Sequence, residues 1–578
     1  MRALPRLLLA LAALLLAAGS VRAQSAASDA DEEDEAPPPP AANRPAEKLP
    51  ELDLNASLLY QLLLAEIAAQ RGNTGLAAQT YVDLAKRTRD PRIARRALEM
   101  ANAAQLPSLA LEAARAWVDA DPNSAPALQY LTALLISARR VAEAEPYLAK
   151  LLASDGAAAP NGFMQLGRLL AANPDKAANL ALVQRLAERY PDLPQARFAV
   201  AQAALAADDE ALALQEIRRA AELRPDWELA ALLEAQVLQR RSPAAAAQRL
   251  ADYLARFPDS RDVRLNYARV LVADRRLAEA RAEFEKLLAA NPGNADVIYA
   301  VGVLAAQLKD YPTAEANLKR LLEMGYRDAN GVRLALGQIA EEQKDWARAI
   351  EWYQQVTGEQ RFVATLRAAG AMAKQGRLED ALARVRGAEP ADPQQKVQQV
   401  IFEAQLLRDS SRNRDALDLL SRALEAQPEQ PELLYDHALT AEKLERFDVL
   451  EANLRKLIQM QPEHAHAYNA LGYSLADRNQ RLPEARKLIE RALELAPEDL
   501  FIVDSMGWVL YRQGDLRGAA EQLRRAWTGR PDGEIGAHLG EVLWVMGDRA
   551  EAQRVWREAL QNSPENETLQ KTIKRFTQ

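Results

Sequence analysis

The sequence predicts an all-α superhelical solenoid of about fifteen helix pairs. Three observations carry this prediction. One sequence motif occurs three times at nearly constant spacing in the C-terminal part. The helical period continues almost without a break from Asn55 onward. Alanine and leucine dominate the composition, whereas aromatic residues make up 6 % of the chain. This is the composition of good helix formers.

The threefold stretch covers residues 465–563 and aligns on Gly472, Gly507 and Gly540. The other recurring positions are Leu471, Met506 and Leu539 before the glycine; Leu475, Leu510 and Leu543 after it; Ala485, Ala519 and Ala552; Ala492, Ala526 and Ala559; and the closing Pro497, Pro531 and Pro564. Their recurrence at a period of about 34 residues is typical of the tetratricopeptide repeat.

The spacing explains how such a unit packs. Small residues let the two helices of a pair approach closely, and the proline ends the second helix because it cannot continue it. One pair cannot bury its own apolar faces, but stacked pairs can, and the first helices of the pairs then build a concave surface.

The chain divides by composition into five parts. We predict a signal peptide over residues 1–23, a disordered acidic and proline-rich tail over 24–54, a degenerate repeat array over 55–390, a C-terminal array over 391–564, and a capping helix over 565–578. The leader has Arg2 and Arg6, an apolar run over 7–18 and a small-x-small ending at Ala23, which indicates export. An uncleaved anchor helix is the alternative, but the run is short for a bilayer.

Export in this style predicts a periplasmic protein with no transmembrane segment after the leader. The chain has no cysteine, so it has no disulfide, no thiolate chemistry and no lipoprotein anchor at the cleavage site. The net charge of −8 becomes −11 without the leader, which holds three arginines and no acids, and this disfavours a nucleic-acid partner.

No catalytic or cofactor signature occurs, and the repeats leave no room for a catalytic domain, so we predict a protein that is not an enzyme and has no cofactor. Of the four histidines, His437 is expected in the core, next to the small residue of its repeat. His464 and His466 are two residues apart at a turn, as half of a metal site would be, but no partner at ligand spacing completes it.

Inward-facing positions of the first helices carry aromatic and hydrogen-bonding residues. The predicted partner-binding groove consists of Tyr435, Asn469, Tyr473, Asp504, Trp508, Tyr511, Arg512, Glu541 and Trp544, and the same positions hold His466 and Glu534. Tyrosine, tryptophan and arginine commonly anchor protein partners. The alternative is that Trp508 and Trp544 pack against the next repeat, as we expect of Trp527 and Trp556 in the core.

Two sequence motifs are more specific than a generic repeat requires, namely DSMGWVLYRQGD (504–515) and EIGAHLGEVLWVMGD (534–548). With them the chain resembles the LbcA-type protease adaptors, a family of large exported proteobacterial tetratricopeptide-repeat proteins. The resemblance implies a scaffold that brings a periplasmic carboxy-terminal processing protease together with its substrates. The adaptor of that family is a lipoprotein, whereas this chain has no cysteine for an anchor. An assembly scaffold for polysaccharide export or outer-membrane biogenesis is the alternative function.

Overall fold

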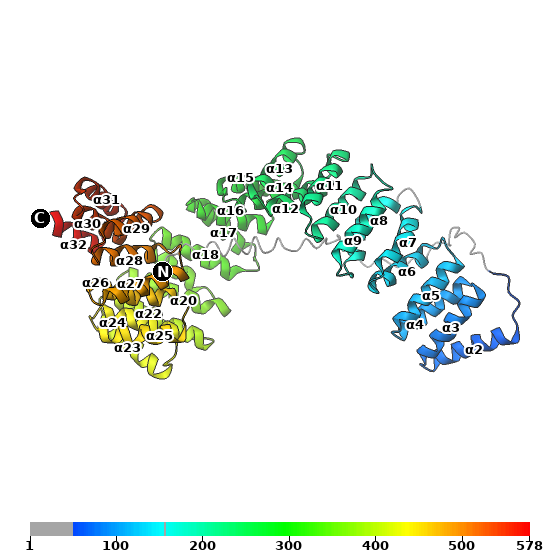
Figure 1. Ribbon diagram of the computed structural model, residues 1–578, viewed down its shortest axis with the longest axis horizontal. Helices are drawn as coiled ribbons and strands as arrows, with labels where there is room; N and C mark the ends of the chain where they lie inside the picture. Colours follow the sequence, from blue (N-terminus) through cyan, green and yellow to red (C-terminus); the bar gives the residue numbers. More distant parts are fainter. Residues whose placement is uncertain (1–49, 155–157, 578) are drawn as a thin grey trace. The chain divides into compact units, whose positions relative to one another are not determined.

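The computed structural model describes residues 50–154 and 158–577. Within these residues the chain is entirely helical, with fifteen successive helix pairs, α2/α3 to α30/α31, then the single helix α32 and no strand (Figure 1). The predicted fold class and number of pairs are confirmed. The predicted signal peptide and most of the predicted acidic tail lie outside the described residues.

The chain forms two compact units that divide between Met324 and Gly325. The first holds α2 (Ala56–Gln70), α3 (Thr74–Thr88), α4 (Pro91–Ala103), α5 (Pro107–Ala120), α6 (Ala125–Ser137), α7 (Val141–Leu152), α8 (Ala158–Leu170), α9 (Lys176–Ala187), α10 (Pro194–Ala206), α11 (Glu210–Leu223), α12 (Glu228–Gln239), α13 (Pro243–Arg256), α14 (Arg261–Ala273), α15 (Leu277–Ala290), α16 (Ala295–Gln307) and α17 (Tyr311–Glu323).

The second unit holds α18 (Ala329–Glu342), α19 (Trp346–Gln354), the 3₁₀ turn η1 (Gly358–Gln360), α20 (Arg361–Lys374), α21 (Leu378–Arg386), α22 (Pro393–Asp409), α23 (Asn413–Ala426), α24 (Pro431–Glu442), α25 (Phe447–Met460), α26 (Ala465–Asp477), α27 (Leu482–Leu495), α28 (Leu500–Arg512), α29 (Leu516–Gly529), α30 (Gly533–Val545), α31 (Arg549–Asn562) and α32 (Glu567–Thr577). The predicted division at residue 390 falls inside this unit, between α21 and α22.

Short turns connect the two helices of each pair and hold them close together. In the last two repeats, Gly514 and Gly547 occupy the left-handed region with φ of 90° and 94°, and an aspartate follows each of them. The carboxylate of Asp515 accepts a hydrogen bond from the Gly518 backbone nitrogen at 2.9 Å and so caps α29. A left-handed residue ends one helix and an acidic cap begins the next, which keeps the connection short.

The aligned glycines permit close helix contact, as the sequence predicts. A methyl group on Gly472 would lie 2.6 Å from Cγ1 of Ile489 and 2.9 Å from the carbonyl oxygen of Ala485 on the partner helix. At Gly507 it would lie 2.5 Å from Cγ of Leu523. These distances leave no room for a side chain, so the glycines set the spacing within each pair.

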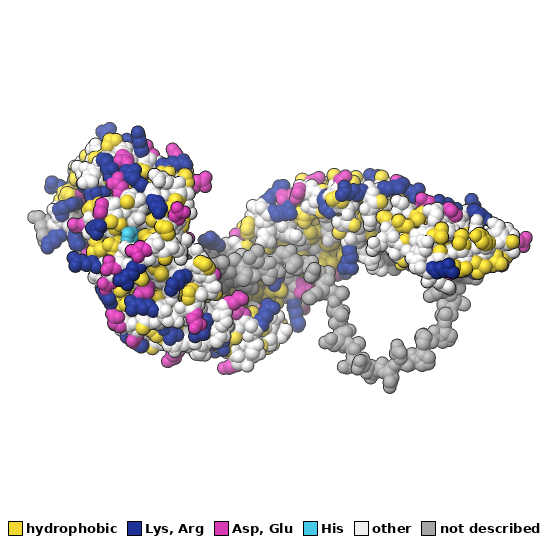
Figure 2. Space-filling view, turned by 90° about the horizontal axis from the view of Figure 1, so that it is seen from below, with side chains coloured by type: hydrophobic (Ala, Val, Ile, Leu, Met, Phe, Trp, Pro, Cys, Tyr) yellow, Lys and Arg dark blue, Asp and Glu magenta, His cyan; other side chains and the backbone are white. Residues whose placement is uncertain are grey.

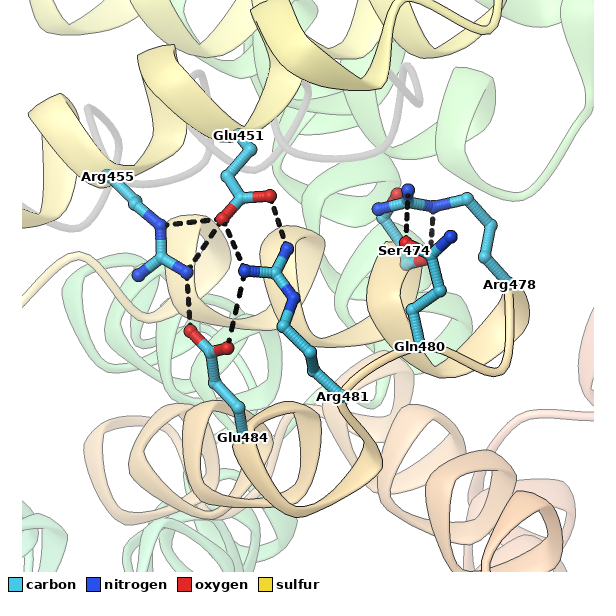
Figure 3. A network of polar contacts seen from close by, with 7 residues as sticks. All are labelled: Glu451, Arg455, Ser474, Arg478, Gln480, Arg481 and Glu484. Carbon is cyan, nitrogen blue, oxygen red and sulfur yellow. Dashed lines mark hydrogen bonds and ion pairs between the residues drawn. The ribbon is translucent and has the colours of Figure 1, made fainter.

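Ion pairs also join the second helices of successive repeats. Glu451 and Arg455 of α25 form a four-residue network with Arg481 and Glu484, which lie at the start of α27 (Figure 3). Arg455 Nε and Arg481 Nη1 both lie 2.9 Å from Oε1 of Glu451. Arg481 holds a left-handed conformation with φ of 45° in the longest turn of the three sharp repeats. The network therefore fixes this turn to the preceding repeat.

The two ends of the array differ in polarity. Leu59, Tyr60, Leu63 and Ile67 of α2 are exposed, and Figure 2 shows hydrophobic side chains gathered over this end of the first unit. The closing helix α32 instead presents charged side chains in its last turn, as a polar cap does in a repeat array. Among the described residues, no helix combines the length and the apolarity needed to cross a bilayer.

Candidate functional site

The candidate site lies on the inner surface of the C-terminal repeats, which we define as the side chains that α24, α26, α28 and α30 present beyond their own pair partners. These are the first helices of four consecutive pairs. Within this set, α26 packs on α28 and α28 packs on α30. Residues about one repeat apart in the sequence therefore become neighbours on one continuous surface.

A buried ion pair joins α28 to α30 at the centre of this surface. Nδ1 of His538 lies 2.9 Å and 3.1 Å from the two carboxylate oxygens of Asp504, and both residues are buried. Burial opposes protonation of the imidazole, but the charge of Asp504 and its hydrogen bond outweigh this and raise the pKa of His538. The carboxylate of Asp504 therefore favours the protonated form of the imidazole.

Trp508 covers this pair. Its ring stacks on His538 with centroids 4.2 Å apart, and its Nε1 donates a hydrogen bond to Oδ1 of Asp477 at 3.2 Å. Only 5 % of the side chain is exposed. Trp508 therefore packs on the next repeat, as the alternative to a groove position predicts. It supports the inner surface from beneath.

Tyr473 is the half-buried ring at the middle of the surface. Its Oη lies 3.4 Å from Nε2 of His538. Burial raises the pKa of Tyr473, and the negative charges of Glu534, Asp477 and Asp504 raise it further. An aromatic side chain thus stands among several carboxylates.

Tyr511, Arg512 and Glu541 extend the network toward the C-terminus. The hydroxyl of Tyr511 donates to Oε1 of Glu541 at 3.1 Å, and burial followed by this carboxylate raises the pKa of Tyr511 to about 12. Arg575 of α32 also pairs with Glu541. Arg512 donates to the backbone oxygen of Asp477 at 3.0 Å, so these three predicted residues hold repeats together.

The remaining predicted residues lie at the edges of this network. The ring centroids of Tyr435 and His464 lie 5.5 Å apart, and Asn469 is half-buried. Trp544 is half-buried and stacks on Trp556 with centroids 5.5 Å apart. The structure therefore brings together Tyr473, Asp504, Trp508, Tyr511, Arg512 and Glu541, and places Tyr435, Asn469 and Trp544 apart from them.

The histidines and core tryptophans take defined positions. His437 is buried between Ser421 Oγ, 2.9 Å from Nε2, and Asn453 Nδ2, 2.7 Å from Nδ1. Nδ1 of His464 accepts a hydrogen bond from the Ala467 backbone nitrogen and caps α26. Trp527 and Trp556 are buried, as expected. Over residues 50–154 and 158–577, no group of three or more histidines, cysteines or acids has a metal-binding arrangement.

Sequence reasoning missed His538, Asp477 and Arg575, which contact the predicted residues directly. A signal was present, because Asp504 and His538 are 34 residues apart, which is one repeat. Residues at equivalent positions of consecutive first helices become neighbours, so complementary types at that spacing indicate a contact between repeats.

The fold and this inner surface define a class of protein, the tetratricopeptide-repeat solenoid. Residues 237–304 match one tetratricopeptide-repeat family, and residues 299–364, 403–449 and 435–499 match another. A tetratricopeptide repeat-containing protein of Pseudomonas aeruginosa is 36 % identical over 530 residues, which cover 90 % of this chain and 88 % of that protein. The chain therefore belongs to the tetratricopeptide-repeat protein family.

The chain is also similar to solved structures, among them the following two. A thermophilic tetratricopeptide protein of Thermus thermophilus is 25 % identical, with a TM-score of 0.29 over 31 % of this chain and 98 % of that one. Yeast Tom70 is 13 % identical, with a TM-score of 0.35 over 90 % of this chain and 95 % of that one.

Proposed function

We propose that this protein is a periplasmic scaffold that binds protein segments on the inner surface of its C-terminal repeats and presents substrates to a carboxy-terminal processing protease. Tetratricopeptide-repeat proteins bind protein partners and are generally not catalytic. The observation that carries the proposal for this chain is the inner surface of α24 to α30, where a half-buried tyrosine stands among carboxylates on helices fixed to one another by ion pairs and stacked rings.

Rigid support favours a binding role for this surface. A partner that binds to ordered side chains loses less conformational entropy than one that must order them first. Asp504, His538 and Trp508 are buried and tied together beneath Tyr473, whose ring they hold in place. The inner surface is therefore preorganised.

The periplasmic location and the protease partnership rest on the sequence. The leader over residues 1–23 is typical of export, and the motifs over 504–515 and 534–548 resemble those of the LbcA-type adaptors. Both motifs supply the buried support of the inner surface, because they include Asp504, Trp508, His538 and Glu541. The motifs that resemble the adaptor family thus coincide with the candidate site, which supports the adaptor proposal.

Reconstitution with purified components tests the proposal. The protease of the same organism is mixed with a peptidoglycan cross-link hydrolase, with and without the scaffold, and cleavage is followed on gels. We expect cleavage to accelerate at least about tenfold with the wild-type scaffold, because a shared scaffold raises the effective concentration of the substrate. Equal rates with and without the scaffold contradict the adaptor role. Co-purification with an export porin or synthase instead of the protease would favour an assembly scaffold.

A further inference from the structure

The first helices of the C-terminal pairs are acidic, whereas the second helices α25 and α27 carry equal numbers of acidic and basic residues. The first helices α24, α26, α28 and α30 carry seven carboxylates, which are Glu432, Asp436, Glu442, Asp477, Asp504, Glu534 and Glu541, and one basic residue, Arg512. The second helices α29 and α31 instead carry more basic than acidic residues. The inner surface is thus acidic, although the chain as a whole is close to balanced in charged residues.

Some of these carboxylates are neutralised within the protein. Asp436 pairs with Arg408 at 2.7 Å, Asp504 pairs with His538 at 2.9 Å, and Glu541 pairs with Arg575. Their charges therefore contribute to holding repeats together.

The four other carboxylates lack such a cation. Among the described residues, Glu442, Asp477 and Glu534 form no ion pair within 4.0 Å. Glu432 also forms none and instead accepts hydrogen bonds from Gln394 and Gln430. Burial raises the pKa of Glu442 and of Glu534, and the nearby charges of Lys443, Arg478 and His538 offset only part of this rise. Glu534 is nevertheless open to solvent. A ligand can therefore reach this carboxylate.

A buried hydroxyl points to the same place. Ser474 is 2 % exposed, and its Oγ has no hydrogen-bond partner within bonding distance among the described residues. It directly follows Tyr473 in α26 and lies beside Glu442. A buried hydroxyl without a close partner is costly unless a ligand or water completes it.

We propose that Glu442, Asp477 and Glu534 form a site, centred on Tyr473, for a lysine or arginine side chain of an extended, basic segment in the bound partner. This inference rests on the proposed function and names the chemical class of the segment. The carboxylates supply the missing counter-charge, and the half-buried ring of Tyr473 supplies an aromatic face for the cation. Charge complementarity selects this occupant, because an acidic segment would meet uncompensated carboxylates.

Labelled peptides test the site on the full chain. The probe is a fluorescein-labelled twelve-residue peptide, (Arg-Gly-Ser)₄, and its neutral twin carries citrulline in place of each arginine. We expect anisotropy to show binding of the arginine peptide that weakens with added salt, and at least about tenfold weaker binding of the citrulline peptide. Equal binding of the two peptides overturns the inference without any variant of the protein.

Two charge-matched variants locate the binding. Glu442→Gln with Glu534→Gln removes two charges from the inner surface, whereas Glu490→Gln with Glu494→Gln removes two from α27. We expect at least about tenfold weaker binding for the first pair and less than about twofold for the second. Equal losses of peptide affinity in the two variants would show that overall charge, and not this site, determines binding, and would overturn the inference. Binding of CaCl₂ alone, measured by calorimetry and lost in the first pair, together with no binding of the arginine peptide, would make the site a metal site and overturn the inference.

The outcomes separate this inference from the proposed function. If the first pair of substitutions leaves acceleration of substrate cleavage intact and the arginine peptide does not bind, the scaffold role stands and the basic segment is wrong. If the scaffold never accelerates cleavage but binds the arginine peptide through these carboxylates, the site stands and the adaptor role is wrong.

Discussion

Asp504 and His538 face each other across two consecutive repeats, with Nδ1 of the imidazole 2.9 Å from a carboxylate oxygen and both side chains buried. Because the residues belong to α28 and α30, the pair joins two consecutive repeats, which the hydrogen bond from Tyr511 to Glu541 also connects. Trp508 stacks on the imidazole and shields the pair from water. The centre of the inner surface is therefore a charged contact between repeats.

Removing one charge of this pair is expected to destabilise the protein. Asp504→Asn leaves the imidazole buried without its counter-charge, and we expect a loss of about 3 kcal/mol in the free energy of unfolding of this region. Chemical denaturation followed by tryptophan fluorescence measures it. The double variant with His538→Gln should recover part of the loss, because it removes the unpaired group. A loss below about 0.5 kcal/mol in Asp504→Asn would show that the pair contributes little.

The two buried histidines are expected to give opposite pH dependences. The pKa of His538 is raised above 6.5 in the folded state, so its contribution to stability is complete below pH 6.5 and disappears as the pH rises through the raised value. Burial, followed by the charge of Arg446, lowers the pKa of His437, so its contribution is present above pH 6.5 and disappears as the pH falls.

Unfolding curves of His538→Gln and His437→Gln between about pH 5.5 and 8.5 check both signs. The stability difference from the wild type should shrink with rising pH for His538→Gln and grow with rising pH for His437→Gln. The same slope in both variants would contradict the assigned protonation states.

Gly472 of α26 and Gly302 of α16, both on first helices, are expected to differ in their tolerance of a methyl group. Gly472→Ala would meet the backbone oxygen of Ala485 at 2.9 Å, which cannot move without shifting the helix, and we expect a cost of about 2 kcal/mol. At Gly302 the nearest atoms belong to the Leu318 side chain at 3.2 Å, so Gly302→Ala should cost less than about 1 kcal/mol. Thermal unfolding of the two variants ranks them, and an inverted order would be inconsistent with backbone contact as the cause.

The two tryptophans of the predicted groove should respond differently to truncation. Trp508 is 5 % exposed and stacked on His538, so Trp508→Ala is expected to cost about 3 to 5 kcal/mol of stability. Trp544 is only half-buried, and Trp544→Ala should cost about 2 kcal/mol. Calorimetric melting temperatures provide the measurement. Equal effects would contradict the different burial of the two rings.

Much of the fold follows from the sequence because its signals are local. Prolines and small residues mark where helices begin, end and approach, and these marks repeat along the chain. The fifteen predicted pairs therefore match α2/α3 to α30/α31. The division at Met324 is a property of the packing between repeats, which the composition that predicts a division at residue 390 does not reveal.

The site was less predictable because repeat position gives the direction of a side chain and not its burial. Trp508 and Tyr473 both occupy inward-facing positions, but the first is covered by the next repeat and the second is half-buried. Which of them a partner can touch depends on the side chains one repeat further along, His538 among them. Comparing residues one period apart would have indicated this contact.

Site-specific photo-crosslinking tests the central claim most directly, namely that the inner surface of the C-terminal repeats binds a protein partner. A photo-reactive benzoylphenylalanine replaces Tyr473 on the inner surface or, as the control, the exposed Lys487 of α27. We predict a light-dependent, covalent complex with the purified protease or its substrate from position 473 and none from position 487. Crosslinks only from position 487, or none from position 473 under conditions in which the scaffold accelerates cleavage, would contradict the claim.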